Sequence, residues 1–241
     1  MNSPVDLNDY TSLCSRVSGK INKILARLGE QSKGERSGEI KVLPEDEMLA
    51  ITPDTGMFFK ILLSAMHARR ILEIGTSVGY STLWFAEAMI QDATTGPEGA
   101  EKQIITVDMN RSKIERATKN FHEAGVSGLI EVLEGNARNI LHELLKNFDG
   151  KNHIKKTDGL FDFVFFDADK EYLREYLDLV LPMLRTGGIV ATDNMLYPEE
   201  YRPLMKEYAN YVRSKPSLHS VTVPIGNGEE ITIKLASEAR L

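Results

Sequence analysis

The chain has little cysteine and no excess of positive charge. Cys14 is the single cysteine among 241 residues, so no disulfide can form within the chain. A reducing compartment suits such a chain, and we expect it to be cytoplasmic. Lysine and arginine number 29 against 35 aspartates and glutamates, which gives a net charge of −6. This balance argues against a dedicated nucleic-acid-binding protein, although a local basic patch remains compatible with it.

Long apolar runs are missing as well. No run approaches the roughly 18 apolar residues that a membrane span requires. The first residues, MNSPVDLNDYTSL, have no basic segment followed by an apolar stretch, so we expect no secretory signal. The contents of 42% hydrophobic and 27% charged residues are ordinary for a soluble globular protein and exclude a disordered or collagen-like chain. We expect a single domain over residues 1–241, with a helical extension at 1–50 and a ligand-binding core at 51–241.

The chain alternates short apolar strands with helical patterns after residue 57. The N-terminal part has helical spacing at Ile21, Ile24, Leu25 and Leu28, and the polar stretch QSKGERSG at 31–38 predicts a flexible loop. Strands are predicted at 70–75, 103–108, 130–133, 161–166, 188–192, 220–224 and 230–235, and helices at 57–66, 80–90, 111–124, 137–148, 171–184 and 203–213.

This alternation predicts an α/β fold built from βαβ units around a mostly parallel sheet. The last two strand patterns have no helix between them and are joined by IGNG at 225–228, a hairpin signal. One of the two must therefore run antiparallel. In open α/β sheets ligands bind beyond the carboxyl ends of the strands, so the residues just after each strand are the candidates for a site.

The first two strands end in residues suited to an adenosine-type ligand. Gly75 and Gly79 allow a tight turn and a close ligand approach to the following helix. The dinucleotide pattern Gly-x-Gly-x-x-Gly lacks its middle glycine here, which argues against a nicotinamide cofactor. Asp108 ends the second strand, where an acid can accept both ribose hydroxyls. An ordinary turn and a helix-capping aspartate remain alternatives for each feature taken alone.

The fourth and fifth strands end in oxygen-bearing side chains. Asp167 follows one strand, and Asp193 and Asn194 follow the next. If the two strands are neighbours, these residues converge at one edge of the sheet. Two carboxylates and an amide oxygen suit Mg²⁺ or Ca²⁺, whereas no Cys/His cluster for zinc is present in the sequence. The alternative is that the acids only cap the following helices.

Lys170 lies three residues after Asp167, about one helical turn. Beside a divalent cation and partly buried, a lysine can take a proton from a cation-bound hydroxyl. Without the oxygen set, a surface lysine paired with Asp169 or Glu171 is the simpler interpretation.

These segments resemble the cation-dependent, S-adenosylmethionine-dependent O-methyltransferases, which include the catechol and caffeoyl-coenzyme A enzymes. The similarity covers about residues 40–235 and looks closer to the caffeoyl-coenzyme A and microbial branch. The matching segments are ITPDTG at 51–56, LEIGTSVGYS at 72–81, ITVD at 105–108, FDFVFFDADK at 161–170, GGIVATDN at 187–194 and PIGNG at 224–228.

The resemblance implies a Rossmann-like methyltransferase fold with seven strands, the last antiparallel, and a homodimer. It implies that Asp167, Asp193 and Asn194 bind a divalent cation, Mg²⁺, and that Lys170 is the catalytic base. The implied cofactor-site residues are Thr52, Glu73, Gly75, Ser81, Asp108, Ala137 and Asp167. Residues 1–40 match no segment of the family, and the stretch LYPEEYR at 196–202 falls where relatives vary and is expected to shape the acceptor pocket.

The implied activity is methyl transfer from S-adenosylmethionine to a hydroxyl of a small molecule with adjacent hydroxyls, such as a catechol or another phenolic compound. Three alternatives are considered at this point. A tRNA hydroxyuridine-type O-methyltransferase would need a basic face, which Lys151, Lys155 and Lys156 would supply. A nicotinamide-dependent oxidoreductase is disfavoured by the missing glycine, and a silent binding module has no use for the acids and lysine together.

Overall fold

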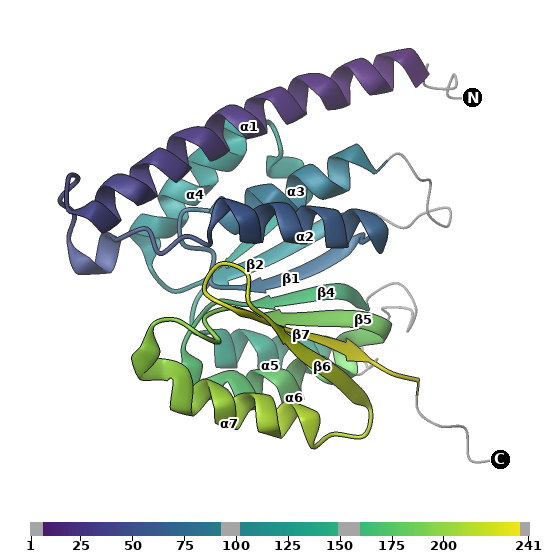
Figure 1. Cartoon of the computed structure of the whole chain (residues 1–241). Coiled ribbons are helices and arrows are strands. Elements are labelled where there is room, and N and C mark those ends of the chain that lie inside the picture. Colours follow the sequence, from purple (N-terminus) through teal and green to yellow (C-terminus); the bar gives the residue numbers. More distant parts are fainter. Residues whose placement is uncertain (1–6, 93–101, 149–159, 237–241) are drawn as a thin grey trace.

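A computed structural model describes residues 7–92, 102–148 and 160–236 of the chain. Seven strands form one sheet in the order β3-β2-β1-β4-β5-β7-β6, with helices on both faces (Figure 1). The strands are β1 (Arg70–Ile74), β2 (Gln103–Asp108), β3 (Ile130–Glu134), β4 (Phe161–Phe166), β5 (Leu184–Thr192), β6 (Leu218–Val223) and β7 (Glu229–Lys234). The helices are α1 (Leu7–Ser37), α2 (Pro53–Ala65), α3 (Tyr80–Gln91), α4 (Arg111–Ala124), α5 (Ala137–Phe148), α6 (Leu173–Val180) and α7 (Arg202–Arg213).

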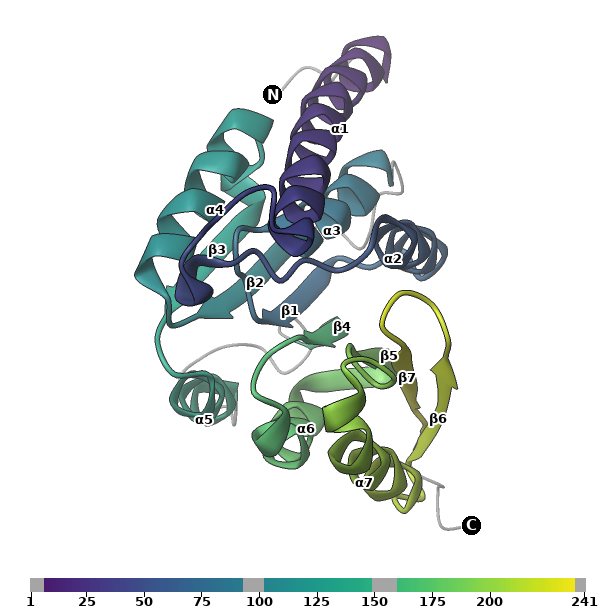
Figure 2. The ribbon, with the colours of Figure 1, turned by 60° about the vertical axis from the view of Figure 1, so that its left-hand side comes forward.

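The strand directions confirm the expected mixed sheet. Strands β1 to β5 pair in parallel, whereas β7 runs antiparallel to both β5 and β6. The parallel strands need helical crossovers, and the chain supplies them, while the five-residue link at 224–228 allows only an antiparallel hairpin. In Figure 2 this hairpin loop reaches toward α2, and a Cβ added to Gly226 would lie 2.1 Å from the hydroxyl oxygen of Thr55.

Each face of the sheet has its own apolar core, because successive side chains of a buried strand point in opposite directions. On β4, Phe163 and Phe165 pack beneath α1, α2, α3 and α4, whereas Val164 and Phe166 pack against α5, α6 and α7. Figure 1 shows these two helical layers above and below the sheet. The continuous apolar runs of the central strands are thus explained by burial on both faces.

The predicted loop at 31–38 is wrong, because α1 continues through it to Ser37. Burial stabilises the helix there. Ser32 and Glu35 are 6% and 7% exposed, and a Glu35 carboxylate oxygen accepts a hydrogen bond from the Met48 backbone at 2.7 Å. Contacts with residues far away in the sequence, absent from a local composition pattern, outweigh the low helix propensity of this polar segment.

The single helix predicted at 171–184 is also wrong in its extent. The α-helical part is α6 alone, flanked by short 3₁₀ turns at Lys170–Tyr172 and Leu181–Met183. Pro182 explains the early end, since proline lacks the N–H that a continuing helix needs. In the part of the chain that the structure describes, no helix combines the length and the apolar character needed to cross a bilayer.

Candidate active site at the carboxyl ends of the strands

The residues after β1, β4 and β5 lie side by side because the backbone ladders continue past the strands. The Asp167 backbone donates to the Ile74 carbonyl at 2.9 Å, and the Asp193 backbone donates to the Phe166 carbonyl at 3.0 Å. The condition set in the sequence analysis, that Asp167 and Asp193 follow neighbouring strands, is therefore met. The candidate cation residues and the glycine turn after β1 share one edge of the sheet.

Gly75 is required where the turn after β1 meets the end of β4. Its φ of +108° is strained for other residues, and a Cβ there would lie 2.1 Å from the Asp167 carbonyl oxygen. Gly79 has a different use. It starts α3 with a φ of +83°, and its Cβ would strike the Phe121 ring of α4 at 2.4 Å. The first glycine thus serves the candidate site and the second serves helix packing.

Glu73 is buried within β1 and accepts three hydroxyl hydrogen bonds. Ser81 and Thr82 donate to it at 2.5 Å each, and Thr106 donates at 2.6 Å. Burial raises the pKa of Glu73 to about 7, against the lowering effect of these hydrogen bonds. Two predicted site residues, Glu73 and Ser81, thereby meet, and Thr82 and Thr106 are partners that the sequence interpretation missed.

The raised pKa of Glu73 makes the stability of the fold depend on pH. The folded-state pKa lies above the unfolded one, so the stabilising contribution is complete below about pH 4.5 and is lost as the pH rises through about 7. Glu73→Gln removes this titration, so the loss of stability between these pH values should shrink by roughly 3 kcal/mol. Denaturant unfolding at several pH values measures it, with Glu143→Gln on the exposed face of α5 as the control. An unchanged pH slope in Glu73→Gln would contradict the assignment.

Asp108 ends β2 with a half-buried carboxylate that is already oriented by the backbone. It accepts hydrogen bonds from the amides of Ser77 at 2.7 Å and Asn110 at 2.9 Å. The capping role considered for Asp108 belongs to Asn110, whose side chain accepts from the Lys113 amide at the start of α4. Asp108 therefore keeps the orientation that a ribose-binding acid at a strand end needs.

The remaining predicted cofactor residues stand at helix starts. Thr52 is the N-cap of α2, and its hydroxyl accepts from the Thr55 amide at 3.2 Å. Ala137 begins α5, and the side chain of the preceding Asn136 accepts from the Arg138 amide at 3.1 Å. Helix starts carry backbone N–H groups without intrahelical partners, which suit polar or anionic ligand groups.

The predicted base lies against the predicted cation ligands. Lys170 Nζ is 3.4 Å from Asp167 Oδ1, and only 10% of the lysine side chain is exposed. The alternative of a surface lysine paired with Asp169 or Glu171 does not fit this burial. Asp193 is 2% exposed, and burial together with the charge of Asp167 raises its pKa to about 7. Asn194 has a φ of +68° and donates its backbone N–H to Asp193 Oδ1 at 2.6 Å.

Glu229 is a member of this region that the sequence interpretation missed. It begins β7, is fully buried and has two carboxylate oxygens without a hydrogen-bond donor in the described chain. Its pKa is raised well above the ordinary value by burial and by Asp193. A glutamate immediately after a glycine-rich turn gives no sign in the sequence that its side chain faces the interior.

This donor set fits a hard cation. Among the described residues no three His, Cys, Asp or Glu side chains converge as an ion site by themselves, and an ion here would need the amide oxygen of Asn194 as well. Buried carboxylates that face one another are unfavourable unless positive charge lies between them. Asp167, Asp193 and Asn194 offer oxygens alone, which is the chemistry that Mg²⁺ prefers.

Comparison with known proteins places the chain in a family. A sequence profile described as O-methyltransferase matches residues 35–233. The chain belongs to the O-methyltransferase family. The flavonoid 3',5'-methyltransferase of Vitis vinifera is 33% identical over 168 residues, which cover 70% of this chain and 65% of the grape protein, just under two thirds of its length. Caffeoyl-CoA O-methyltransferase 5 of Nicotiana tabacum is 29% identical over 196 residues, 75% of each chain.

Solved structures agree with this membership. The O-methyltransferase TomG of Streptomyces achromogenes, solved in complex with SAM, has 26% identity and a TM-score of 0.69 and covers 88% of this chain and 90% of its own. The Rossmann-like methyltransferase fold expected from the sequence is confirmed. A nicotinamide-dependent oxidoreductase is set aside by the family, and the lysines considered for tRNA binding, at 151, 155 and 156, lie outside the described residues.

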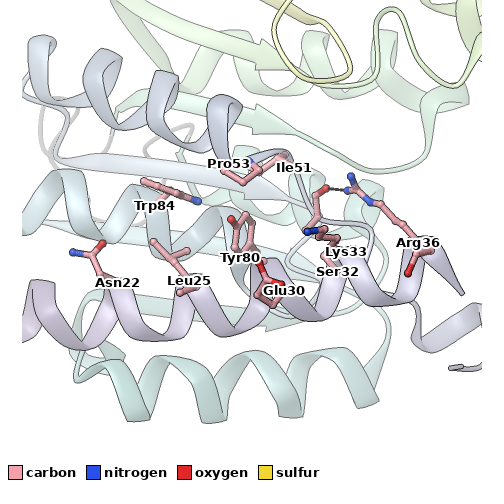
Figure 3. A pocket seen from close by; sticks show the side chains of 14 residues that line it. Asn22, Leu25, Glu30, Ser32, Lys33, Arg36, Ile51, Pro53, Tyr80 and Trp84 are labelled. Carbon is pink, nitrogen blue, oxygen red and sulfur yellow. Dashed lines mark hydrogen bonds between the residues drawn. The ribbon is translucent and has the colours of Figure 1, made fainter. Parts of the chain in front are cut away.

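A cavity of this O-methyltransferase lies beside the predicted cofactor residues. It measures about 680 Å³ and is lined from α1, from the segment before α2 and from the start of α3 (Figure 3). Ile51 and Pro53, on either side of Thr52, line it together with Tyr80, which precedes Ser81. The acids after β4 and β5 are absent from its lining, so this cavity and the candidate cation residues are separate features of the described chain.

Proposed function

We propose that this O-methyltransferase transfers the methyl group of S-adenosylmethionine to one hydroxyl of a small phenolic molecule with adjacent hydroxyls, with the help of a divalent cation, Mg²⁺. The observation that carries the proposal is the set of buried Asp193 and partly buried Asp167, Lys170 and Asn194 beside the Gly75 turn. The names of the relatives, a flavonoid methyltransferase and a caffeoyl-CoA O-methyltransferase, support a phenolic acceptor.

The cofactor side of the site is supported by groups that are fixed before a ligand arrives. Asp108 is held by two backbone amides and is suited to accept the ribose hydroxyls. The backbone at Gly75 leaves room for a close approach, because no side chain stands there. Thr52 just before α2, Glu73 in β1, Ser81 in α3, Ala137 at the start of α5 and Asp167 just after β4 are proposed to complete the cofactor site.

On the acceptor side, Asp167, Asp193 and Asn194 would hold the cation. When bound, the cation chelates two adjacent oxygens and makes a hydroxyl more acidic. Lys170 Nζ lies 3.4 Å from Asp167 Oδ1 and, as the neutral amine, would accept the hydroxyl proton. The cofactor side and the acceptor side of the site meet at the backbone of Gly75 and Asp167. This contact favours alignment of the methyl donor and the acceptor hydroxyl at near-attack distance.

A methyl-transfer assay with labelled S-adenosylmethionine tests the proposal. Purified protein should methylate members of a catechol panel in the presence of Mg²⁺, and EDTA should remove this activity, because the acceptor oxygens then lose their positioning group. Phenols with a single hydroxyl serve as the matched acceptors, and calorimetry with NAD is the control for the cofactor. Full activity in EDTA would contradict the cation, and equal turnover of single phenols would contradict the requirement for adjacent hydroxyls.

We also propose that the enzyme is a homodimer. Exposed apolar side chains on α2 and on the edge strand support a protein contact: Ile61 is 63% exposed and Val221 is 58% exposed. Light scattering at micromolar concentration should give the mass of two chains, and a mass of one chain would refute it.

A further inference from the structure

Glu229 and Asp193 face each other across the strand pair β5–β7. Thr192 pairs with Glu230 in antiparallel register, so the next pair along is Asp193 opposite Glu229. Residues directly opposite in an antiparallel pair present their side chains on the same face, with Cβ atoms about 5 Å apart. Both side chains are buried at this position, with 2% of Asp193 and 0% of Glu229 exposed.

Glu230 provides the contrast, because it is equally buried on the same strand. Its carboxylate receives hydrogen bonds from Arg213 at 2.8 Å, from Ser220 at 2.7 Å and from Thr222 at 2.5 Å. Its burial is therefore explained by partners of its own. Glu229 has the same charge and the same exposure of 0%, and both of its oxygens lack a donor in the described chain.

We propose that Glu229 is a positioning residue of the cation site, which holds the carboxyl group of Asp193 in place from the neighbouring strand β7. This inference rests on the divalent cation of the proposed function. The residues at this edge carry three carboxyl groups, Asp167, Asp193 and Glu229, against the one ammonium group of Lys170. A bound divalent cation compensates this surplus, and no other buried carboxylate on β7 has the same need.

Direct measurement of Mn²⁺ binding tests the inference without relying on turnover. The electron paramagnetic resonance signal reports the concentration of free Mn²⁺. A titration therefore gives the Mn²⁺ dissociation constant of the wild-type protein, of Glu229→Gln and of Glu230→Gln. We expect Glu229→Gln to weaken Mn²⁺ binding by about tenfold or more, as expected for a group that orients a metal ligand. Glu230→Gln, with the same change of charge one residue away, should bind Mn²⁺ as wild type does.

S-adenosylmethionine affinity and thermal unfolding are measured on the same samples to confirm that each variant is folded. Should Glu229→Gln prove unstable, Glu229→Leu fills the position without a polar group and should weaken Mn²⁺ binding at least as much. Equal or tighter Mn²⁺ binding by folded Glu229 variants, or the same weakening in Glu230→Gln, would overturn the inference and leave the proposed function intact. Absence of Mn²⁺ binding by wild type would overturn the cation itself and the role of Glu229 with it.

Discussion

Lys170→Ala is expected to lower the turnover of methyl transfer by roughly 10²-fold or more, the usual size of a general-base contribution. Lys170 Nζ lies 3.4 Å from Asp167 at the edge where the acceptor hydroxyl is proposed to lie. The substitution removes the proton acceptor and leaves the oxygens of Asp167, Asp193 and Asn194 in place. Binding of Mn²⁺ and of S-adenosylmethionine should therefore persist in the variant.

Lys170→Arg is the matched variant, because it keeps the positive charge beside Asp167. Arginine stays protonated in proteins, so it should fail to restore turnover. Asp193→Ala distinguishes the role of the cation from the role of the base. This variant should lose Mg²⁺-dependent activity and keep cofactor binding. Single-turnover methyl transfer to a catechol at several pH values measures all three variants. Wild-type turnover in Lys170→Ala would show that the cation alone activates the hydroxyl.

Gly75→Ala should destabilise the fold by about 4 kcal/mol or more, which is the range of severe backbone clashes. The added Cβ would lie 2.1 Å from the Asp167 carbonyl oxygen, and a backbone atom within a sheet cannot move aside as a flexible side chain can. Because the turn and the end of β4 must separate, S-adenosylmethionine binding should be lost as well. Denaturant unfolding and calorimetry measure the two effects.

Gly38→Ala is the control for the unusual backbone angle alone. Gly38 has a φ of +76°, and a Cβ there would meet nothing within 4 Å. Its substitution should cost only about 1–2 kcal/mol, the strain of a left-handed residue with a side chain. If Gly75→Ala costs no more than Gly38→Ala, the close contact with Asp167 is unimportant.

The central elements were predictable from the sequence because their patterns are local. The predicted bounds of β2, α4, α5 and β4 agree with the structure, since buried parallel strands read as continuous apolar runs and amphipathic helices as a period of 3.6. The continuation of α1 to Ser37 was not predictable in this way. It depends on contacts such as that of Glu35 with Met48, and on residues as distant as Asn120, whose side chain accepts a hydrogen bond from Arg27 at 2.7 Å.

The candidate site divides in the same manner. Asp167, Asp193 and Asn194 were predictable because residues that end neighbouring parallel strands must meet at one edge. The position of Glu229 was not, because it depends on the pairing of β7 with β5. The pair Glu229-Glu230 appears in the sequence as two ordinary surface acids, and only the register of β7 against β5 directs one toward Asp193 and the other toward Arg213.

The contact between Gly75 and Asp167 also bears on how the range of acceptors can diverge in this enzyme. The spacing of donor and acceptor sides is set by neighbouring strands of one sheet, about 4.8 Å apart, and hydrogen-bonded backbone offers no gradual adjustment. Variation in acceptor size must then be accommodated outside the sheet. The segment after Asn194 is suited to this, because Tyr197 is 60% exposed and Leu196 is 37% exposed. Selection for a new acceptor would accordingly change the amino acids at residues 196–202, while the residues at the strand ends stay the same.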